Sequence, residues 1–183
     1  VVTHAEQPAV SLRLIVRAGA AYDPASRPGV AALVSTLLDQ GTATRSAQQI
    51  ADTVAMAGGD LETGTGRDLS FVRMVLMKDS LRLGLGLLAD VVRSPALAEE
   101  EIERQRKQTL SALQVSYEDP GYLADVIFDR LVYGTSPYGL PGHGTPDSVR
   151  SLTREDLLAF HRTYYAPNNC LLAVVGDVSV SEA

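Results

Sequence analysis

The chain has 183 residues, of which 45% are hydrophobic and 21% are charged, and its formal net charge is -6. This length and composition predict one folded domain with a substantial core and exclude a disordered chain. The acidic balance disfavours nucleic-acid binding, which usually requires a basic patch, and no apolar run is long enough to cross a membrane.

The single cysteine and the first residue give the remaining general expectations. Cys170 has no second cysteine to pair with, and the apolar residues that follow it predict a buried strand position. The sequence begins at Val1 without a methionine, so we expect residues 1–183 to be one domain of a longer protein. Any signal peptide would then lie outside this sequence, which leaves the compartment open.

Hydrophobic patterns predict strands that alternate irregularly with helices. Residues 10–17 alternate apolar with mostly polar side chains, as a half-buried strand does. Ser46 and Thr153 are typical residues for the start of a helix, and Gly58 and Gly59 for its end. The other predicted elements are helices within 28–40, 80–94, 96–120, 121–134 and 152–167, strands over 67–79 and 168–179, and a loop over 135–152. This order predicts an α+β fold, with a mostly antiparallel sheet and helices packed on one face.

The first predicted helix lies in the segment RPGVAALVSTLLDQGT, with Pro28 expected at its first position and Gly41 just past its end. At 100° per residue one stripe is strongly apolar and formed by Val30, Leu33, Val34, Leu37 and Leu38. Ala32, Ser35 and Thr36 lie together on the other side, since residues three and four apart are neighbours on a helix.

This triangle has the spacing of a known metal site. In the inverted zincin motif HxxEH, two histidines bind zinc, and the glutamate between them activates the zinc-bound water. Zinc requires donors such as imidazole nitrogen, thiolate or carboxylate. Ala32 has no donor atom, Ser35 cannot act as a base at neutral pH, and Thr36 is a poor ligand.

Several collinear segments together resemble the insulinase/pitrilysin zinc peptidases, which include the mitochondrial processing peptidase. In that family the helix reads close to GxAHFLEHMLFxGT, and here it reads GVAALVSTLLDQGT. The resemblance continues through VRAGAAYDP, AGGDLETGTGRD, LGLLADVVRSP, EEIERQRKQTLSALQVSYEDP and the closing section from SPYGLPGHGT to LLAVVGDV.

The resemblance assigns zinc binding and catalysis to particular positions, and this chain lacks the required residues at those positions. Ala32 and Thr36 stand where the family has its zinc histidines, and Ser35 stands where it has the base glutamate. The third ligand, a glutamate on the later long helix, aligns with Ala112 or its neighbour, and residues 107–117 contain no carboxylate. We therefore expect no catalytic residue and no bound metal in this chain.

A second pair of positions departs from the family pattern at the substrate edge. Glu62 and Thr63 replace the Asn-Ala pair that is usual in active members. This difference is weaker evidence than the missing zinc ligands, because these residues do not bind the metal.

The family architecture is a clamshell of two related halves, each with two α+β domains, and one half is often degenerate. The resemblance implies that this chain is the first domain of a degenerate half, which encloses unstructured peptides together with a catalytic HxxEH half or subunit that supplies the zinc. Nucleic acid and membranes are not expected partners. We expect a periplasmic location, as for many bacterial relatives, with the cytoplasm also open.

Two other functions stay open at this stage. A purely structural scaffold would resemble the core subunits of the cytochrome bc1 complex, and an active hydrolase would need an unrecognised site. A replacement zinc site from His4, His143 and His161 is disfavoured because they are predicted on different elements, and His161 is expected to be packed or partly exposed. The stretch GLGLLA at 84–89 matches a loose dinucleotide pattern but lies inside a predicted helix, so a phosphate loop is not expected.

Overall fold

The computed structural model describes residues 1–182, and it places five strands in one sheet with the order β1-β5-β2-β4-β3. The strands are β1 (Val2–Thr3), β2 (Ala9–Val16), β3 (Asp60–Thr65), β4 (Ser70–Met77) and β5 (Cys170–Gly176). β1 runs parallel to β5, and every other neighbouring pair is antiparallel.

Seven α-helices and four short 3-10 helices accompany this sheet within the described residues. The α-helices are α1 (Val30–Leu37), α2 (Ala47–Met56), α3 (Leu81–Arg93), α4 (Glu99–Ser116), α5 (Pro120–Tyr133), α6 (Pro146–Ser151) and α7 (Arg154–Tyr164). The 3-10 helices are η1 (Ala20–Tyr22), η2 (Lys78–Ser80), η3 (Pro137–Gly139) and η4 (Pro167–Asn169). The predicted α+β class is confirmed, and none of the described helices is long and apolar enough to cross a bilayer.

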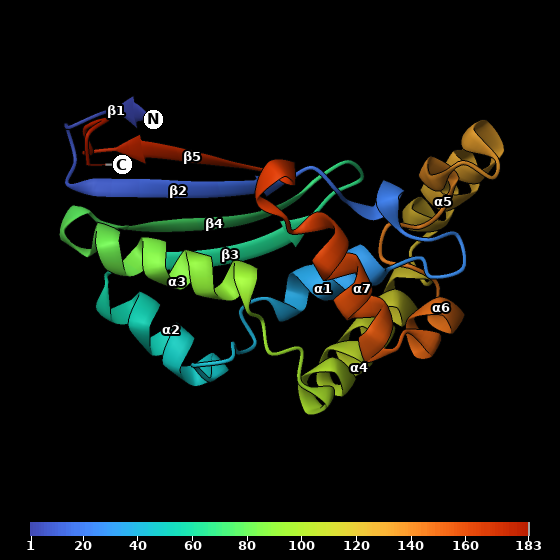
Figure 1. The fold of residues 1–183 in the computed structure, drawn as a ribbon. Coiled ribbons are helices and arrows are strands. Elements are labelled where there is room, and N and C mark those ends of the chain that lie inside the picture. Colours follow the sequence, from blue (N-terminus) through green and yellow to red (C-terminus); the bar gives the residue numbers. More distant parts are fainter. Residues whose placement is uncertain (183) are drawn as a thin grey trace.

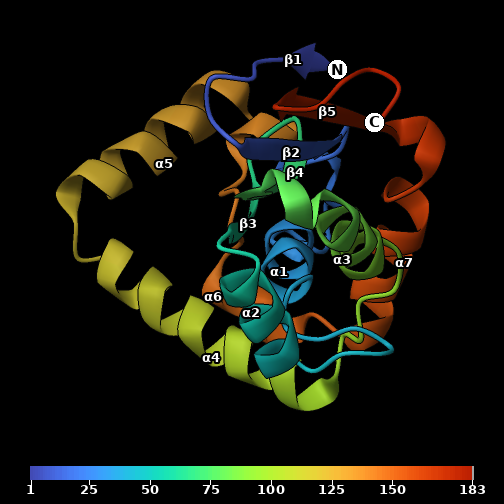
Figure 2. The same ribbon diagram turned by 90° about the vertical axis from the view of Figure 1, so that its left-hand side faces the viewer.

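The two faces of the sheet differ in what covers them. Leu12, Val72 and Met74 point to one face and are buried, since this face packs against helices that include α3. Residues of the opposite parity, such as Arg13 and Arg73, are exposed on the second face, which we call the open face. Helices α4 and α5 form an arm that extends on the side of the open face (Figures 1 and 2).

Local signals in the sequence account for several helix boundaries. Ser46 and Thr153 each form a capping box, with Gln49 and Asp156 as reciprocal partners, so both predicted N-caps are confirmed. Strand β3 and helix α6 were not predicted. β3 contains only one strongly apolar residue, Leu61, and α6 is six residues long within a segment rich in Pro and Gly.

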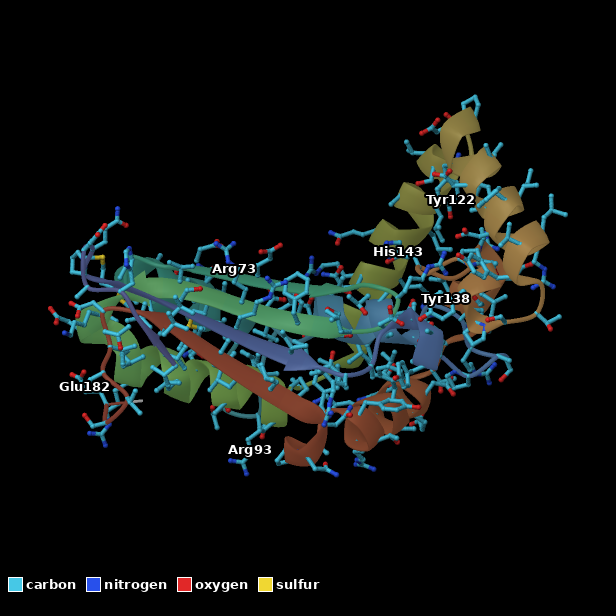
Figure 3. All side chains as sticks on the ribbon, turned by 90° about the horizontal axis from the view of Figure 1, so that it is seen from above. Arg73, Arg93, Tyr122, Tyr138, His143 and Glu182 are labelled. Carbon is cyan, nitrogen blue, oxygen red and sulfur yellow. The ribbon has the colours of Figure 1, made fainter. Side chains whose placement is uncertain are left out.

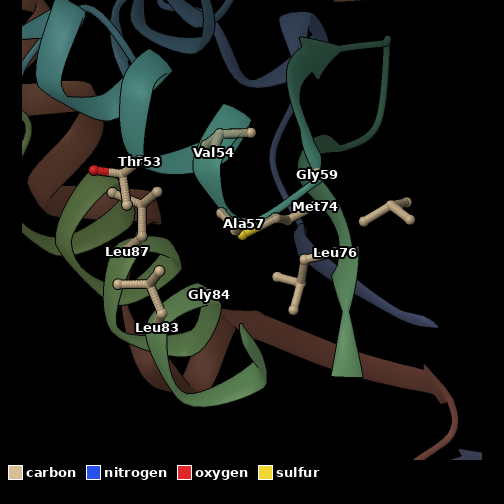
Figure 4. A pocket seen from close by; sticks show the side chains of 10 residues that line it. Thr53, Val54, Ala57, Gly59, Met74, Leu76, Leu83, Gly84 and Leu87 are labelled. Atoms are coloured by element: carbon tan, nitrogen blue, oxygen red, sulfur yellow. The ribbon is translucent and has the colours of Figure 1, made fainter. Parts of the chain in front are cut away.

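The GLGLLA stretch lies inside α3 and has a packing role. A side chain on Gly84 would overlap the side chain of Leu76 on β4, so the glycine lets α3 approach the sheet closely. Beside it lies a small pocket between α2, α3 and β4, lined largely by apolar side chains such as Leu83 and Leu87 (Figure 4). The expectation that this stretch is no phosphate loop agrees with its helical conformation.

Candidate functional site

The start of α1 is fixed by a carboxylate from the preceding loop. The backbone N–H groups of Gly29 and Ala31 donate to the two Asp23 oxygens, at 2.6 and 2.9 Å. Gly29 is the N-cap residue and adopts a left-handed conformation with φ 97°. The prediction that Pro28 is the first helical residue was wrong, because the remote Asp23 caps the helix and Val30 begins it.

Burial raises the pKa of the Asp23 carboxyl to about 6, although the N–H groups of Ala31, Gly29 and Val30 act in the opposite direction. The side chain is only 9% exposed. This group therefore serves as an anchor for α1. A cap seven residues before the first helical position has no standard spacing, so the sequence indicates it only weakly.

The three positions of the predicted triangle lie on α1 in different surroundings. Ala32 and Ser35 are buried, at 7% and 1% exposure, while Thr36 is exposed. The Thr36 hydroxyl donates to the carbonyl of Leu33 at 3.0 Å, and the Ser35 hydroxyl has no hydrogen-bond partner within the described residues 1–182. The side of α1 away from its strongly apolar stripe is thus mostly buried as well, because α1 contacts α4, α7, β3 and β4.

The fourth position, Ala112, lies on α4, which packs against α1. Its side chain is exposed and carries no donor atom. Together these positions offer two hydroxyl groups, one engaged with its own helix and one buried, and neither hydroxyl is among the usual ligands of zinc. The residues present do not fit a zinc ion, so no chemical step can be derived through one here.

Glu62 and Thr63 lie on β3, which is an edge strand of the sheet and contacts α1. The register places Glu62 opposite Arg73 on the open face and Thr63 opposite Val72 on the other face. The Glu62 carboxylate is 3.4 Å from an Arg73 nitrogen, and both side chains are about half exposed. The structure therefore places both residues at a free strand edge beside α1, and their role there stays a prediction.

The three histidines have separate environments. His161 is buried, its Nε2 lies 2.8 Å from the carbonyl of Val92, and burial lowers its pKa. His4 is exposed and lies 3.7 Å from Glu6. The backbone of His143 packs against Gly29 at the start of α1. Residues 1–182 contain no group of three or more His, Cys, Asp or Glu side chains arranged to hold a metal.

One polar cluster that was not predicted joins the arm to the sheet. Arg67, in the turn between β3 and β4, donates to Asp129 on α5 at 2.5 Å and to the carbonyl of Leu140. In the same turn, Asp68 accepts a hydrogen bond from the Tyr138 hydroxyl, which raises the pKa of that phenol. The partners are more than 60 residues apart, so no local pattern could indicate these contacts.

Comparison with known proteins places this arrangement in a family. A model described as "Insulinase (Peptidase family M16)" matches residues 1–135, and a second, "Peptidase M16 inactive domain", matches residues 151–183. An uncharacterized zinc protease of Mycobacterium leprae is 31% identical over 94% of this chain and 39% of its own length. One from Rickettsia bellii is 28% identical over 94% of this chain and 42% of its own length.

Solved structures share the fold closely. A crystal structure titled as a peptidase M16 inactive domain from Pseudomonas fluorescens has a TM-score of 0.95 and 32% identity, and covers 98% of this chain and 44% of that one. Pitrilysin has a TM-score of 0.86 at 19% identity, covering 98% of this chain and 20% of its own, which shows the fold alone.

Helix α1, the edge strand β3 and the long helix α4 lie in an α+β domain with the fold of M16 peptidase domains. The chain belongs to the insulinase family, peptidase family M16. It spans about two-fifths of the length of the curated relatives it matches.

Proposed function

We propose that this chain is a non-catalytic domain of a zinc metalloendopeptidase, which encloses and binds unstructured peptides while another half or subunit supplies the zinc. The observation that carries this proposal is the donor set on α1. By the family resemblance, Ala32, Ser35 and Thr36 stand at the HxxEH positions, in a domain whose fold is otherwise that of the family.

The burial of Ser35 supports the loss of catalytic chemistry at this position. A catalytic base must reach a water molecule bound to the metal. The Ser35 hydroxyl is buried and has no hydrogen-bond partner among residues 1–182, and a neutral hydroxyl is not a base at neutral pH, so it lacks both the basicity and the access for that role. The Pseudomonas fluorescens structure, which is described as a peptidase M16 inactive domain, supports the same assignment.

The shape of the domain supports a role in enclosing a substrate. The open face of the sheet and the α4–α5 arm lie on the same side, so together they present two walls meeting at an angle (Figure 2). The edge strand β3 has hydrogen bonds only to β4 within the sheet, and an extended peptide can pair with such an edge. The partner that we propose is a catalytic half containing HxxEH, and the periplasmic location stays a prediction.

Zinc content tests the proposal directly. We expect the purified chain, treated with excess zinc and then desalted, to retain far less than one zinc per chain by elemental analysis. Stoichiometric zinc, or peptide hydrolysis by the chain alone, would contradict the proposal.

Restoration of the ligands tests the placement of the site. The variant Ala32→His, Ser35→Glu, Thr36→His, Ala112→Glu should bind about one zinc per chain, because it supplies three ligands and a base in the inverted-zincin pattern. Ala32→His alone is the matched control, since a single imidazole holds zinc weakly. A restored variant that folds, by circular dichroism, and takes up no zinc would show that the positions are misassigned.

The scaffold role is the alternative, and reconstitution separates the two. Mixing this chain with an HxxEH half from the same organism should raise hydrolysis of an unstructured peptide above that of the active half alone. A complex that forms without any gain in hydrolysis would favour the scaffold.

A further inference from the structure

We propose that the open face of the sheet binds carboxylate groups of acidic, extended peptides, with Arg13 and Arg73 as the receiving side chains. This inference rests on the proposed function and specifies the chemistry of the peptides that the domain binds.

The sheet register places the two arginines side by side. Arg13 on β2 and Arg73 on β4 are directly opposite partners in the antiparallel ladder, and both are exposed. Like charges at directly opposite positions destabilise a sheet. Such a pair is unfavourable in the free domain, and a carboxylate between the two guanidinium groups would relieve the repulsion.

Neither arginine has a strong partner among the described residues. The Arg13 guanidinium lies over the Phe71 ring, 5.0 Å from its centre, and makes none of the ion pairs found within residues 1–182. Arg73 approaches Glu62 at 3.4 Å, and an ion pair this exposed contributes little. The Phe71 ring holds the Arg13 guanidinium in a defined place and leaves its N–H donors free for a ligand.

Apolar side chains surround the two charges on the same face. Ile15 stands opposite Phe71 on one neighbouring strand and opposite Leu171 on the other, and Leu171 is 56% exposed. Val175, 40% exposed, lies further along β5. Two arginines surrounded by apolar side chains fit a peptide that carries carboxylates among apolar residues. This arrangement distinguishes the open face from a uniformly charged surface.

The position of the face supports a peptide as its occupant. Arg73 points to the side on which the arm extends, whereas Arg93 lies at the opposite side of the sheet (Figure 3). The anionic groups of an unmodified peptide are its carboxylates, and guanidinium groups bind carboxylates through bidentate hydrogen bonds.

Fluorescence anisotropy with three labelled unstructured peptides tests the proposal. The peptides share one sequence with leucines and differ only at two positions, which are Glu, Gln or Lys. We expect the Glu peptide to bind the chain about tenfold more tightly than the Gln peptide, as charge-assisted hydrogen bonds to a carboxylate imply. Raising the salt concentration should reduce this preference.

Three variants assign the preference to the arginine pair. The double variant Arg13→Gln, Arg73→Gln should bind the Glu and Gln peptides equally. Arg93→Gln removes the same charge from an exposed arginine at the end of α3, and it should retain the full preference. Thermal unfolding checks the fold, and the double variant should be no less stable than the wild type, since it loses a repulsive pair.

Several results would overturn the inference. These are equal binding of Glu and Gln peptides by the wild type, a preference that survives in the double variant, or no binding of any peptide. Self-association that the double variant abolishes would assign the face to a second copy of the chain and would equally overturn it. The proposed function is judged separately by zinc content, so a chain without zinc and without carboxylate preference would refute only this inference.

Discussion

Helices α1 and α5 lie at opposite extremes of burial in one small domain. Seven of the eight α1 residues are buried, including the polar Ser35, whereas α5 has 14 residues and none of them is buried. Helix α1 therefore depends on tertiary packing. Helix α5 has local signals of its own, with Asp119 capping the N–H of Gly121 and Pro120 at the first position.

The exposed side of α5 carries an apolar stripe. Ala124, Ile127, Phe128 and Leu131 follow the spacing i, i+3, i+4, i+7, and Leu131 is 79% exposed. A stripe of this kind on the surface is typical of a contact region. The comparison thus separates a central helix that holds the domain together from an arm that presents surface to other molecules.

The largest expected effect is the loss of core packing in α1. Leu37 is 1% exposed, so Leu37→Ala should lower the free energy of unfolding by about 2–5 kcal/mol. The matched change in α5, Leu131→Ala, should alter it by less than about 0.5 kcal/mol. Urea denaturation measures both, and similar losses in the two variants would contradict the division into core and arm.

Removal of one capping oxygen should have the next largest effect. In Asp23→Asn the amide can offer only one oxygen acceptor to the N–H groups of Gly29 and Ala31, so we expect a loss of about 1–3 kcal/mol. Asp52→Asn is the control, because Asp52 is an exposed carboxylate on α2. An unchanged unfolding midpoint in Asp23→Asn would show that the cap is unimportant.

The pH dependence of stability reports the same carboxyl. Its pKa is raised in the folded state, from 3.8 to about 6, so the folded chain binds this proton more tightly than the unfolded chain. Titration of Asp23 therefore lowers the free energy of unfolding as the pH rises from 3.8 through about 6, and this pH-dependent part is fully present only below pH 3.8. Urea denaturation at several pH values between 3.8 and about 6 should show this fall in the free energy of unfolding in the wild type and not in Asp23→Asn.

How far the sequence predicts the structure also differs between the two regions. Strand β2 and the N-caps at Ser46 and Thr153 depend on residues close in the chain, and they were predicted correctly. The contact of Arg67 with Asp129 joins residues 62 positions apart, and the α1 cap by Asp23 spans six to eight residues without a standard capping spacing, so neither was predicted. Strand β3 escaped prediction because an edge strand needs few apolar side chains, and this one has a single leucine.

The candidate site shows the same limit. The pattern on α1 was enough to place Ala32, Ser35 and Thr36 together, since helical spacing fixes neighbours. It could not show that Ser35 is fully buried, because that depends on the helices and strands around α1. The opposite positions of Arg13 and Arg73 likewise require the strand register, which a single sequence does not contain.

Ser35→Ala should produce a smaller effect of the opposite sign. The buried hydroxyl has no partner in the part of the chain that the structure describes, so it carries a desolvation cost without a compensating hydrogen bond. We expect the alanine variant to be as stable as the wild type or more stable by up to about 1 kcal/mol, measured by urea denaturation. A clear loss of stability would mean that the hydroxyl makes a hydrogen bond in solution.

The smallest effect on global stability is expected at the link between arm and sheet. Arg67→Ala removes the contacts with Asp129 and Leu140, and these side chains are only partly buried, so the free energy of unfolding should change by about 1 kcal/mol or less. Amide hydrogen exchange over residues 120–133 should nevertheless accelerate, because the arm loses its attachment to the β3–β4 turn. Arg130→Ala is the control, since Arg130 bonds only to Gly134 at the end of the same helix, at 2.9 Å. If both variants left exchange in α5 unchanged, the arm would be held by its own helix connections, and the polar cluster at Arg67 would have no part in orienting it toward the open face.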